Sequence, residues 1–133
     1  KTVVYINLSD KMLYTSGSAT ITSRADEVLG KIAQIVAARP EVEVMVEGYT
    51  DSQPINTECF KDNWDLSVLR ATSVVRRLQN KYGVNPEQLI ASGRSSYQPL
   101  VPNDSRENRS KNRRTRIILM PNIDKFFALM EAN

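Results

Sequence analysis

The stretch "EVEVMVEGYTDSQPI", residues 41–55, contains a strand that ends abruptly at a charged residue. Apolar and polar side chains alternate along it, and this pattern predicts a central strand over 41–49. Asp51 follows the strand directly, and Arg70 stands nineteen residues later, near the start of the next predicted helix. A carboxylate and a guanidinium in these places would be able to hold the two charges of a zwitterionic ligand.

Strands and helices alternate on both sides of this stretch. Their order, β-α-β-α-β-(α)-β, predicts an α+β fold in which a mixed sheet carries its helices packed on one face. The chain is expected to form one domain over 1–133, because it is too short for two. The predicted strands cover 2–8, 41–49, 89–93 and 113–120. The predicted helices cover 22–38, about 67–82, 105–112 and 123–130, with a loop over 9–19 that continues as a strand at 12–14 and a capped turn at 85–88.

Composition places the chain among ordinary globular proteins. Of its 133 residues 41% are hydrophobic and 25% are charged, and the net charge is +3. No apolar run approaches the ~20 residues of a membrane helix. The chain starts at Lys1 rather than at Met, so we expect it to be part of a longer protein, with any targeting or anchoring segment upstream.

The residue types argue against enzyme chemistry. The chain has no histidine and a single cysteine, so it cannot build a disulfide framework or a zinc knuckle. Hydrolysis would need a metal or a nucleophile activated by a base. We therefore expect no catalytic residue, no metal and no cofactor. Cys59 is expected to be an inert thiol, and Trp64 is expected to pack in the core or at its rim.

Arg70 has an unusual predicted position. If Ser67 caps the helix, Arg70 occupies the third helical position, where a cation opposes a helix dipole that favours anions by about 0.3–1 kcal/mol. A ligand carboxylate would relieve this conflict by binding the free N–H groups and Arg70 together. The alternative is that Asp51 is an ordinary turn residue and Arg70 an ordinary surface arginine.

The run "RENRSKNRRTR", residues 106–116, carries six basic residues and one acid. It is interpreted first as a solvated face. The alternative function is a binder of nucleic acid or of another anionic surface through this run. Such binding would weaken steeply with salt and would need aromatic stacking partners, of which the run has none.

Three separated motifs resemble the OmpA-like peptidoglycan-binding domain. They are "GYTD" at 48–51, "LSVLRA" at 66–71 and "NRR" at 112–114, in the order and at the spacing of the family, and "MLYTSGSATI" at 12–21 resembles its first block. The resemblance covers nearly the whole chain. The insertion over 52–64 looks most like the one found in MotB-type stator proteins and in many envelope proteins of this family.

The resemblance implies non-covalent binding of the cell-wall stem peptide at diaminopimelate. Carried over residue by residue, it implies that Asp51 meets the ammonium of the ligand and that Arg70 meets its carboxylate. Thr50 and Leu66 would contribute around these two residues, largely through their backbones. The domain would tether an envelope protein to the wall on the periplasmic side of a Gram-negative envelope, through an upstream segment in the outer membrane or, in a stator-type protein, the inner membrane.

Further residues are implied by the same resemblance. Arg113 and Arg114 match the arginine pair that shapes or flanks the site, and Tyr14 matches an aromatic position near it. The turn "SGRSSYQP", residues 92–99, departs from the family pattern, so its contacts are not carried over. The expected partner is peptidoglycan, with no nucleic acid and no membrane contact within this chain. Since OmpA-like domains of the stator variety tend to pair, a homodimer is also implied.

Overall fold

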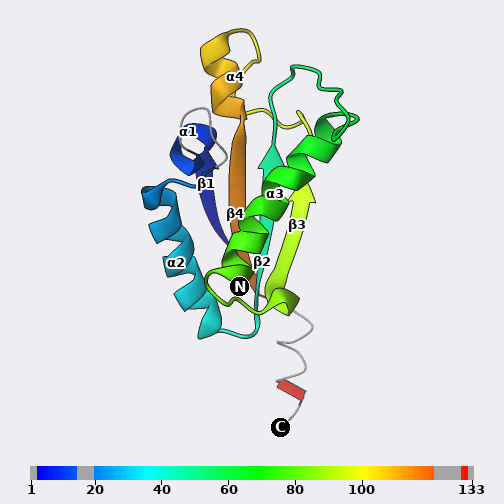
Figure 1. Ribbon diagram of the computed structural model, residues 1–133. Helices are drawn as coiled ribbons and strands as arrows, with labels where there is room; N and C mark the ends of the chain where they lie inside the picture. The colour runs from blue at the N-terminus through cyan, green and yellow to red at the C-terminus, as the bar shows by residue number, and fades with distance from the viewer. Residues whose placement is uncertain (1–2, 15–19, 122–129, 132–133) are drawn as a thin grey trace.

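A four-stranded mixed sheet forms the centre of the computed structural model, which describes residues 3–14, 20–121 and 130–131 (Figure 1). The strands are β1 (Val4–Ser9), β2 (Val42–Tyr49), β3 (Leu89–Gly93) and β4 (Arg114–Pro121), in the spatial order β1-β4-β2-β3. β4 runs antiparallel to both β1 and β2, and β3 runs parallel to β2. The predicted α+β fold with a mixed sheet is therefore confirmed.

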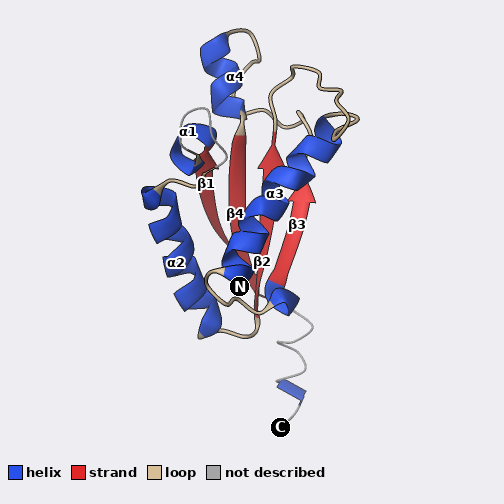
Figure 2. Cartoon of the chain, viewed as in Figure 1, coloured by secondary structure: helices blue, strands red, loops and turns tan. Residues whose placement is uncertain are grey.

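Two long helices, α2 (Ser23–Ala37) and α3 (Asn63–Asn80), lie on one face of this sheet, as predicted (Figure 2). Short helical elements, α1 (Asp10–Leu13), α4 (Arg106–Asn112) and the 3-10 turn η1 (Pro86–Gln88), lie toward the ends of the strands. None of the described helices is long and apolar enough to cross a membrane.

α2 shows how the sequence forms these elements. The Thr22 side chain accepts a hydrogen bond from the N–H of Ala25 at 3.1 Å and so caps the helix. Apolar residues at spacings of three and four then turn one stripe of the helix into the core. The buried members of this stripe are Ala25, Leu29, Ile32, Ala33 and Val36.

Most boundaries lie within one or two residues of the prediction, but the start of α3 and the segment after β1 differ more. α3 begins at Asn63, four residues before the predicted cap Ser67, because the Asp62 side chain accepts hydrogen bonds from the N–H groups of Trp64 and Asp65. The segment predicted as a loop or strand after β1 begins instead with α1, which Ser9 caps. The helix predicted over 123–130 falls almost wholly outside the described residues.

α3 approaches β2 and β3 very closely at two glycines. A Cβ atom added to Gly48 would lie 2.9 Å from the carbonyl carbon of Ser67, and closer still to its oxygen. A Cβ added to Gly93 would lie 2.8 Å from the backbone nitrogen of Val68. Real Cβ atoms essentially never come within 3.0 Å of such neighbours. The absence of a side chain at these positions therefore sets the distance between α3 and the sheet.

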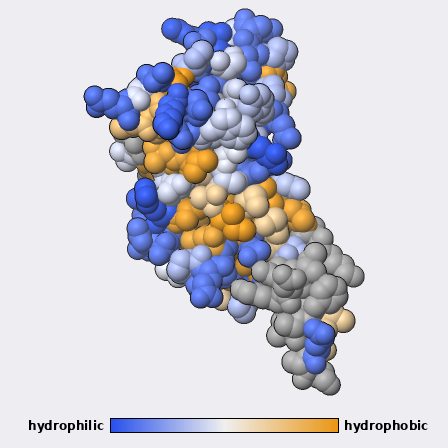
Figure 3. All heavy atoms as spheres, turned by 90° about the vertical axis from the view of Figure 1, so that its right-hand side faces the viewer, coloured by the Kyte–Doolittle hydropathy of each residue, from blue (hydrophilic) through white to orange (hydrophobic). Residues whose placement is uncertain are grey.

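The opposite face of the sheet is polar near the end of β2. Side chains alternate between the two faces of a strand, so Val46 points into the core and Glu47 points away from it. Glu47 is only 4% exposed and accepts hydrogen bonds from Arg94, Arg116 and Tyr49. Seen from the β3 edge, hydrophobic side chains gather across the middle of the molecule, while the end that carries α4 is hydrophilic (Figure 3).

Candidate functional site

A small cavity of about 190 Å³ lies where β2 ends and its connecting loop begins. Its lining comes from this loop, from the first turns of α3 and from the residue before β4. Five of the seven predicted site residues line it together: Thr50, Asp51, Leu66, Arg70 and Arg113. The remaining lining residues are Gln53, Pro54, Ile55 and Asn63. Asp51 and Arg70, nineteen residues apart in sequence, thus face the same small space.

Asp51 is held firmly in this cavity. It is 7% exposed, and its Oδ1 accepts a hydrogen bond of 2.9 Å from the N–H of Gln53. Its Oδ2 accepts a hydrogen bond of 2.5 Å from Nη1 of Arg113. The preceding residue is fixed too, because the N–H of Thr50 donates to the carbonyl of Ser95. The carboxylate therefore has a defined direction and already has one cationic partner.

Arg70 lies about two turns inside α3, and not at the start of a helix. The prediction that Ser67 caps the helix is wrong. Ser67 is fully buried; its hydroxyl donates to the carbonyl of Trp64 and accepts from the N–H of Ser95. The free N–H groups of a helix start therefore do not lie beside Arg70, and the guanidinium alone is left to bind a carboxylate.

The guanidinium of Arg70 sits in a largely buried position, with its side chain 15% exposed. Burial, together with the nearby positive charge of Arg113, lowers the pKa of Arg70 to about 10, so it remains charged at neutral pH. Its Nη2 forms an ion pair with Oδ1 of Asp10, the first residue of α1. Its Nε forms no hydrogen bond within the described part of the chain.

Asp10 is a site residue that the sequence analysis missed. Its position follows from the pairing of β1 with β4, which sets Ser9 opposite Arg114. The N–H of Asp10 donates to the carbonyl of Arg113 at 3.1 Å, and Oδ2 of Asp10 lies 3.9 Å from Nε of Arg113. Two acids and two arginines, Asp10, Asp51, Arg70 and Arg113, thus form one group with no net charge, which we call the charge cluster.

The other two predicted residues lie outside the cavity. Arg114 is 6% exposed, stacks over the ring of Tyr49 at 3.8 Å and donates to the carbonyl of Gln98. Burial lowers its pKa. Tyr14 lies behind Arg70, with its ring centre 5.8 Å from the Arg70 Cζ. Burial raises the pKa of the Tyr14 phenol.

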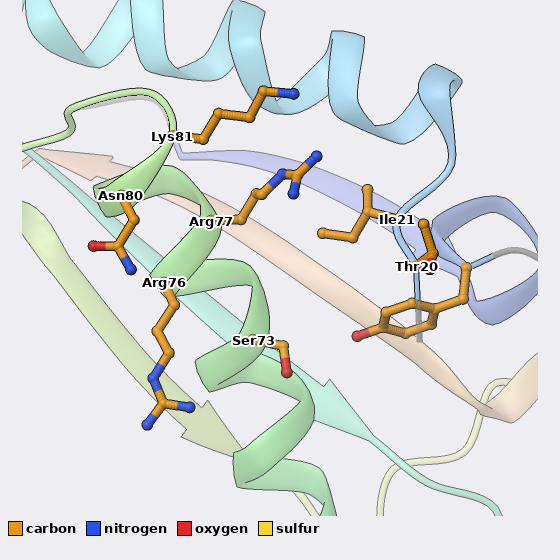
Figure 4. A pocket seen from close by; sticks show the side chains of 8 residues that line it. Thr20, Ile21, Ser73, Arg76, Arg77, Asn80 and Lys81 are labelled. Carbon is orange, nitrogen blue, oxygen red and sulfur yellow. The ribbon is translucent and has the colours of Figure 1, made fainter. Parts of the chain in front are cut away.

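Tyr14 also lines a second, larger cleft of about 630 Å³, which runs between α3 and the residues before α2 (Figure 4). Its cations do not converge. Arg77 and Lys81 extend toward α2, where both form ion pairs with Asp26, whereas Arg76 extends the other way. Hydrogen bonds from Arg77 and Lys81 hold the pKa of Asp26 well below its usual range. The cleft therefore does not form a focused anion site.

The basic run over 106–116 is divided between several environments. Its first residues belong to α4, Arg113 enters the cavity, and Arg116 pairs with Glu47 on the opposite face. It does not form one continuous basic stripe.

In the described ranges, no group of three or more acidic, histidine or cysteine side chains is placed to hold a metal ion. Trp64 is half exposed and does not belong to the buried core; its ring centroid lies 5.6 Å from that of Tyr97.

Known proteins share this fold and about a third of the residues in the matched regions. The model of the OmpA family matches residues 13–113. Motility protein B of Bacillus subtilis is 31% identical over 116 residues, which cover 87% of this chain and 44% of the relative. The periplasmic domain of Helicobacter pylori MotB superposes with a TM-score of 0.74 at 32% identity, covering 96% of this chain and 84% of that one.

A solved structure from another system is equally similar. The cell wall anchor of the type VI secretion system (T6SS) from Pseudomonas aeruginosa gives a TM-score of 0.73 at 30% identity, covering 90% of this chain and 82% of that one. This chain spans less than half the length of the first curated relatives that it matches.

Proposed function

Since this chain belongs to the OmpA family and is an OmpA-like peptidoglycan-binding domain, we propose that it grips the stem peptide of the wall at diaminopimelate. The observation that carries the proposal is the meeting of Asp51 and Arg70 in one cavity of about 190 Å³. A space of this size suits the end of one amino-acid side chain. Diaminopimelate ends in an ammonium and a carboxylate on the same carbon, so opposite charges on the two walls match it.

Each lining residue has a role in this proposal. Asp51 binds the ammonium, and Arg70 binds the carboxylate through a charge-assisted hydrogen bond. Thr50 and Leu66 flank the ligand, and Arg113 lines the cavity beside Asp51. Outside the cavity, Tyr14 packs behind the Arg70 guanidinium, and Arg114 braces the backbone before β4 through its bond to the Asn112 carbonyl.

The biological role follows from binding of the stem peptide. The domain holds a longer envelope protein to the wall in the periplasm without cutting the polymer. The relatives named as a periplasmic domain of MotB and as a cell wall anchor support this role. The membrane segment would lie outside this chain. Pairing of two such domains would add avidity, because a second site on the same polymer binds at a high effective concentration.

Sedimentation with purified sacculi tests the anchoring role. The protein is expected to pellet with insoluble peptidoglycan and to leave its mass and its soluble peptides unchanged. Asp51→Ala should remain in the supernatant, since the ammonium then has no partner. Release of muropeptides that depends on the protein would overturn the non-enzymatic role. Binding that survives Asp51→Ala but disappears in moderate salt would favour the anionic-surface alternative.

Titration calorimetry with two tripeptides tests the ligand. One tripeptide carries diaminopimelate at its third position. The other carries lysine there, which keeps the distal ammonium and lacks the distal carboxylate. A hydrogen bond to a charged group contributes about 1.5–3 kcal/mol, so Arg70 should favour the diaminopimelate peptide over the lysine peptide by roughly ten-fold or more. Arg70→Ala should weaken the diaminopimelate peptide and shrink this preference, while Asp51→Ala should weaken both peptides. Arg76→Ala is the control, because Arg76 lies on the same helix but does not line the cavity. Equal wild-type affinity for the two peptides would refute the role of Arg70.

A further inference from the structure

The charge cluster leaves neither ligand-binding residue without a partner. Asp51 already pairs with Arg113, and Arg70 already pairs with Asp10. Building on the proposed function, we propose that the ligand's ammonium and carboxylate are recognised cooperatively, through an exchange of partners within the charge cluster. Asp10 is the specificity-determining residue of this exchange, because it occupies Arg70 until the ammonium has bound.

Both existing pairs stand in the way of a ligand. Asp51 accepts from the N–H of Gln53 at Oδ1 and from Arg113 at Oδ2, so an incoming ammonium competes with Arg113 for this carboxylate. Arg70 is largely buried and already paired with Asp10, so an incoming carboxylate competes with that acid for the guanidinium. A carboxylate brought close to Asp10 would also be repelled by it unless Asp10 gained another cation.

Arg113 is placed to be that cation. Its Nε already lies 3.9 Å from Oδ2 of Asp10, while its Nη1 binds Asp51. Its side chain is 37% exposed, and its backbone is tied to Asp10 by the 3.1 Å hydrogen bond between the Asp10 N–H and the Arg113 carbonyl. A small rotation of the guanidinium is therefore enough to transfer it from Asp51 to Asp10, without movement of β4 or α1.

The exchange makes the two halves of the ligand interdependent. When an ammonium takes Asp51, the released Arg113 neutralises Asp10, and Arg70 becomes free for the carboxylate. Every charge is then paired before and after binding. A ligand with an ammonium only leaves Arg70 with Asp10. A ligand that has only a carboxylate meets Arg70 while Arg70 is still paired with Asp10. The ammonium and the carboxylate are therefore each bound less well alone than in the zwitterion.

Four tripeptides that differ at the third residue measure this coupling. Diaminopimelate carries both distal charges, lysine carries the ammonium, 2-aminopimelate carries the carboxylate and norleucine carries neither. In the unaltered protein, the affinity gained from the carboxylate should be about ten-fold greater when the ammonium is present than when it is absent, a usual size for coupling between sites. Equal gains would overturn the exchange of partners. Tight binding of diaminopimelate would in that case still support the proposed function. Failure of all four peptides to bind would refute both.

Asp10→Asn identifies the residue responsible. With no acid on Arg70, the ligand carboxylate should raise the affinity by the same factor whether or not the ammonium is present. The 2-aminopimelate peptide should bind Asp10→Asn about ten-fold more tightly than it binds the unaltered protein. Glu41→Gln is the matched control: Glu41 is also 23% exposed and paired with an arginine, but it precedes β2 at the other end of the strand. Weaker binding of 2-aminopimelate by Asp10→Asn would show instead that Asp10 merely positions Arg70. If Asp10→Asn does not fold, the four-peptide comparison on the unaltered protein decides alone.

Discussion

Gly48→Ala is expected to force α3 away from the sheet. Gly48 lies in β2, three residues before Asp51, and faces the backbone of α3 at Ser67. The added Cβ would lie 2.9 Å from the Ser67 carbonyl carbon, whereas ordinary contact begins at 3.4 Å. The helix must therefore withdraw by at least the difference of 0.5 Å, and by more to clear the carbonyl oxygen.

The size of the effect follows from the nature of the neighbour. Backbone atoms inside a helix cannot rotate away, so the strain spreads over the contact of α3 with β2. Overpacking of this kind costs typically 1–3 kcal/mol. Replacing glycine also makes the unfolded chain less flexible, which offsets roughly 0.4–1 kcal/mol. We expect the free energy of unfolding to fall by about 1–2 kcal/mol. Arg70 moves with α3 and Asp51 with β2, so affinity for the diaminopimelate peptide should fall as well.

Urea unfolding followed by circular dichroism, together with peptide titration, measures both effects. Gly30→Ala is the control, because the nearest neighbour of a Cβ at Gly30 in α2 is the side chain of Tyr82, at 3.2 Å, and not a backbone atom. Alanine is the better helix former by about 1 kcal/mol, so this variant should be no less stable than the unaltered protein. A Gly48→Ala protein with unchanged stability and unchanged affinity would show that the helix-to-sheet distance does not set the geometry of the cavity.

Three further outcomes are expected. Cys59→Ser should keep sacculus binding within a few-fold, because Cys59 is exposed and does not line the cavity; complete loss with the fold intact would contradict this. Asp26→Asn should lower the free energy of unfolding at pH 7. Arg77 and Lys81 lower the folded-state pKa of Asp26, so this carboxylate stabilises the folded protein above the unfolded pKa of about 4, and the stabilisation is lost as pH falls below that value. The urea midpoints of Asp26→Asn and of the unaltered protein should therefore converge toward pH 2. A constant difference between the midpoints would refute the role of this ion pair. Asn112→Ala should cost about 2–4 kcal/mol in thermal or urea unfolding, because the fully buried amide of Asn112 makes four hydrogen bonds to the 100–103 segment; a loss below 1 kcal/mol would show that water replaces them.

Local patterns in the sequence were sufficient for most of the elements. The alternation along 41–49 gave β2, and the apolar stripe within 22–38 gave α2. β3 was predicted at 89–93, where it lies. These elements follow from periodicity and capping, which act over a few residues, so a single sequence contains the information.

The errors came from contacts between distant residues. Asp62 and Ser67 are both good cap residues, and the choice between them depends on the loop after β3, whose Ser95 N–H binds the Ser67 hydroxyl. Asp10 reaches Arg70 only because β1 and β4 pair across more than a hundred residues. The motifs identified Asp51 and Arg70, which line the cavity, but the partners of these two residues in the free protein depend on the complete sheet.

The place of β4 in the sheet also has a consequence for the order of folding. β4 is the last described strand in the chain, yet it lies between β1 and β2. During synthesis, β1 therefore has no neighbour in the sheet until Arg114–Pro121 has emerged, and its pairing closes a very long loop. Arg113 arrives immediately before this strand, and Asp10 immediately after β1. In the proposed site, Asp10 and Arg113 are thus brought together last, so a chain interrupted before β4 would not assemble the charge cluster.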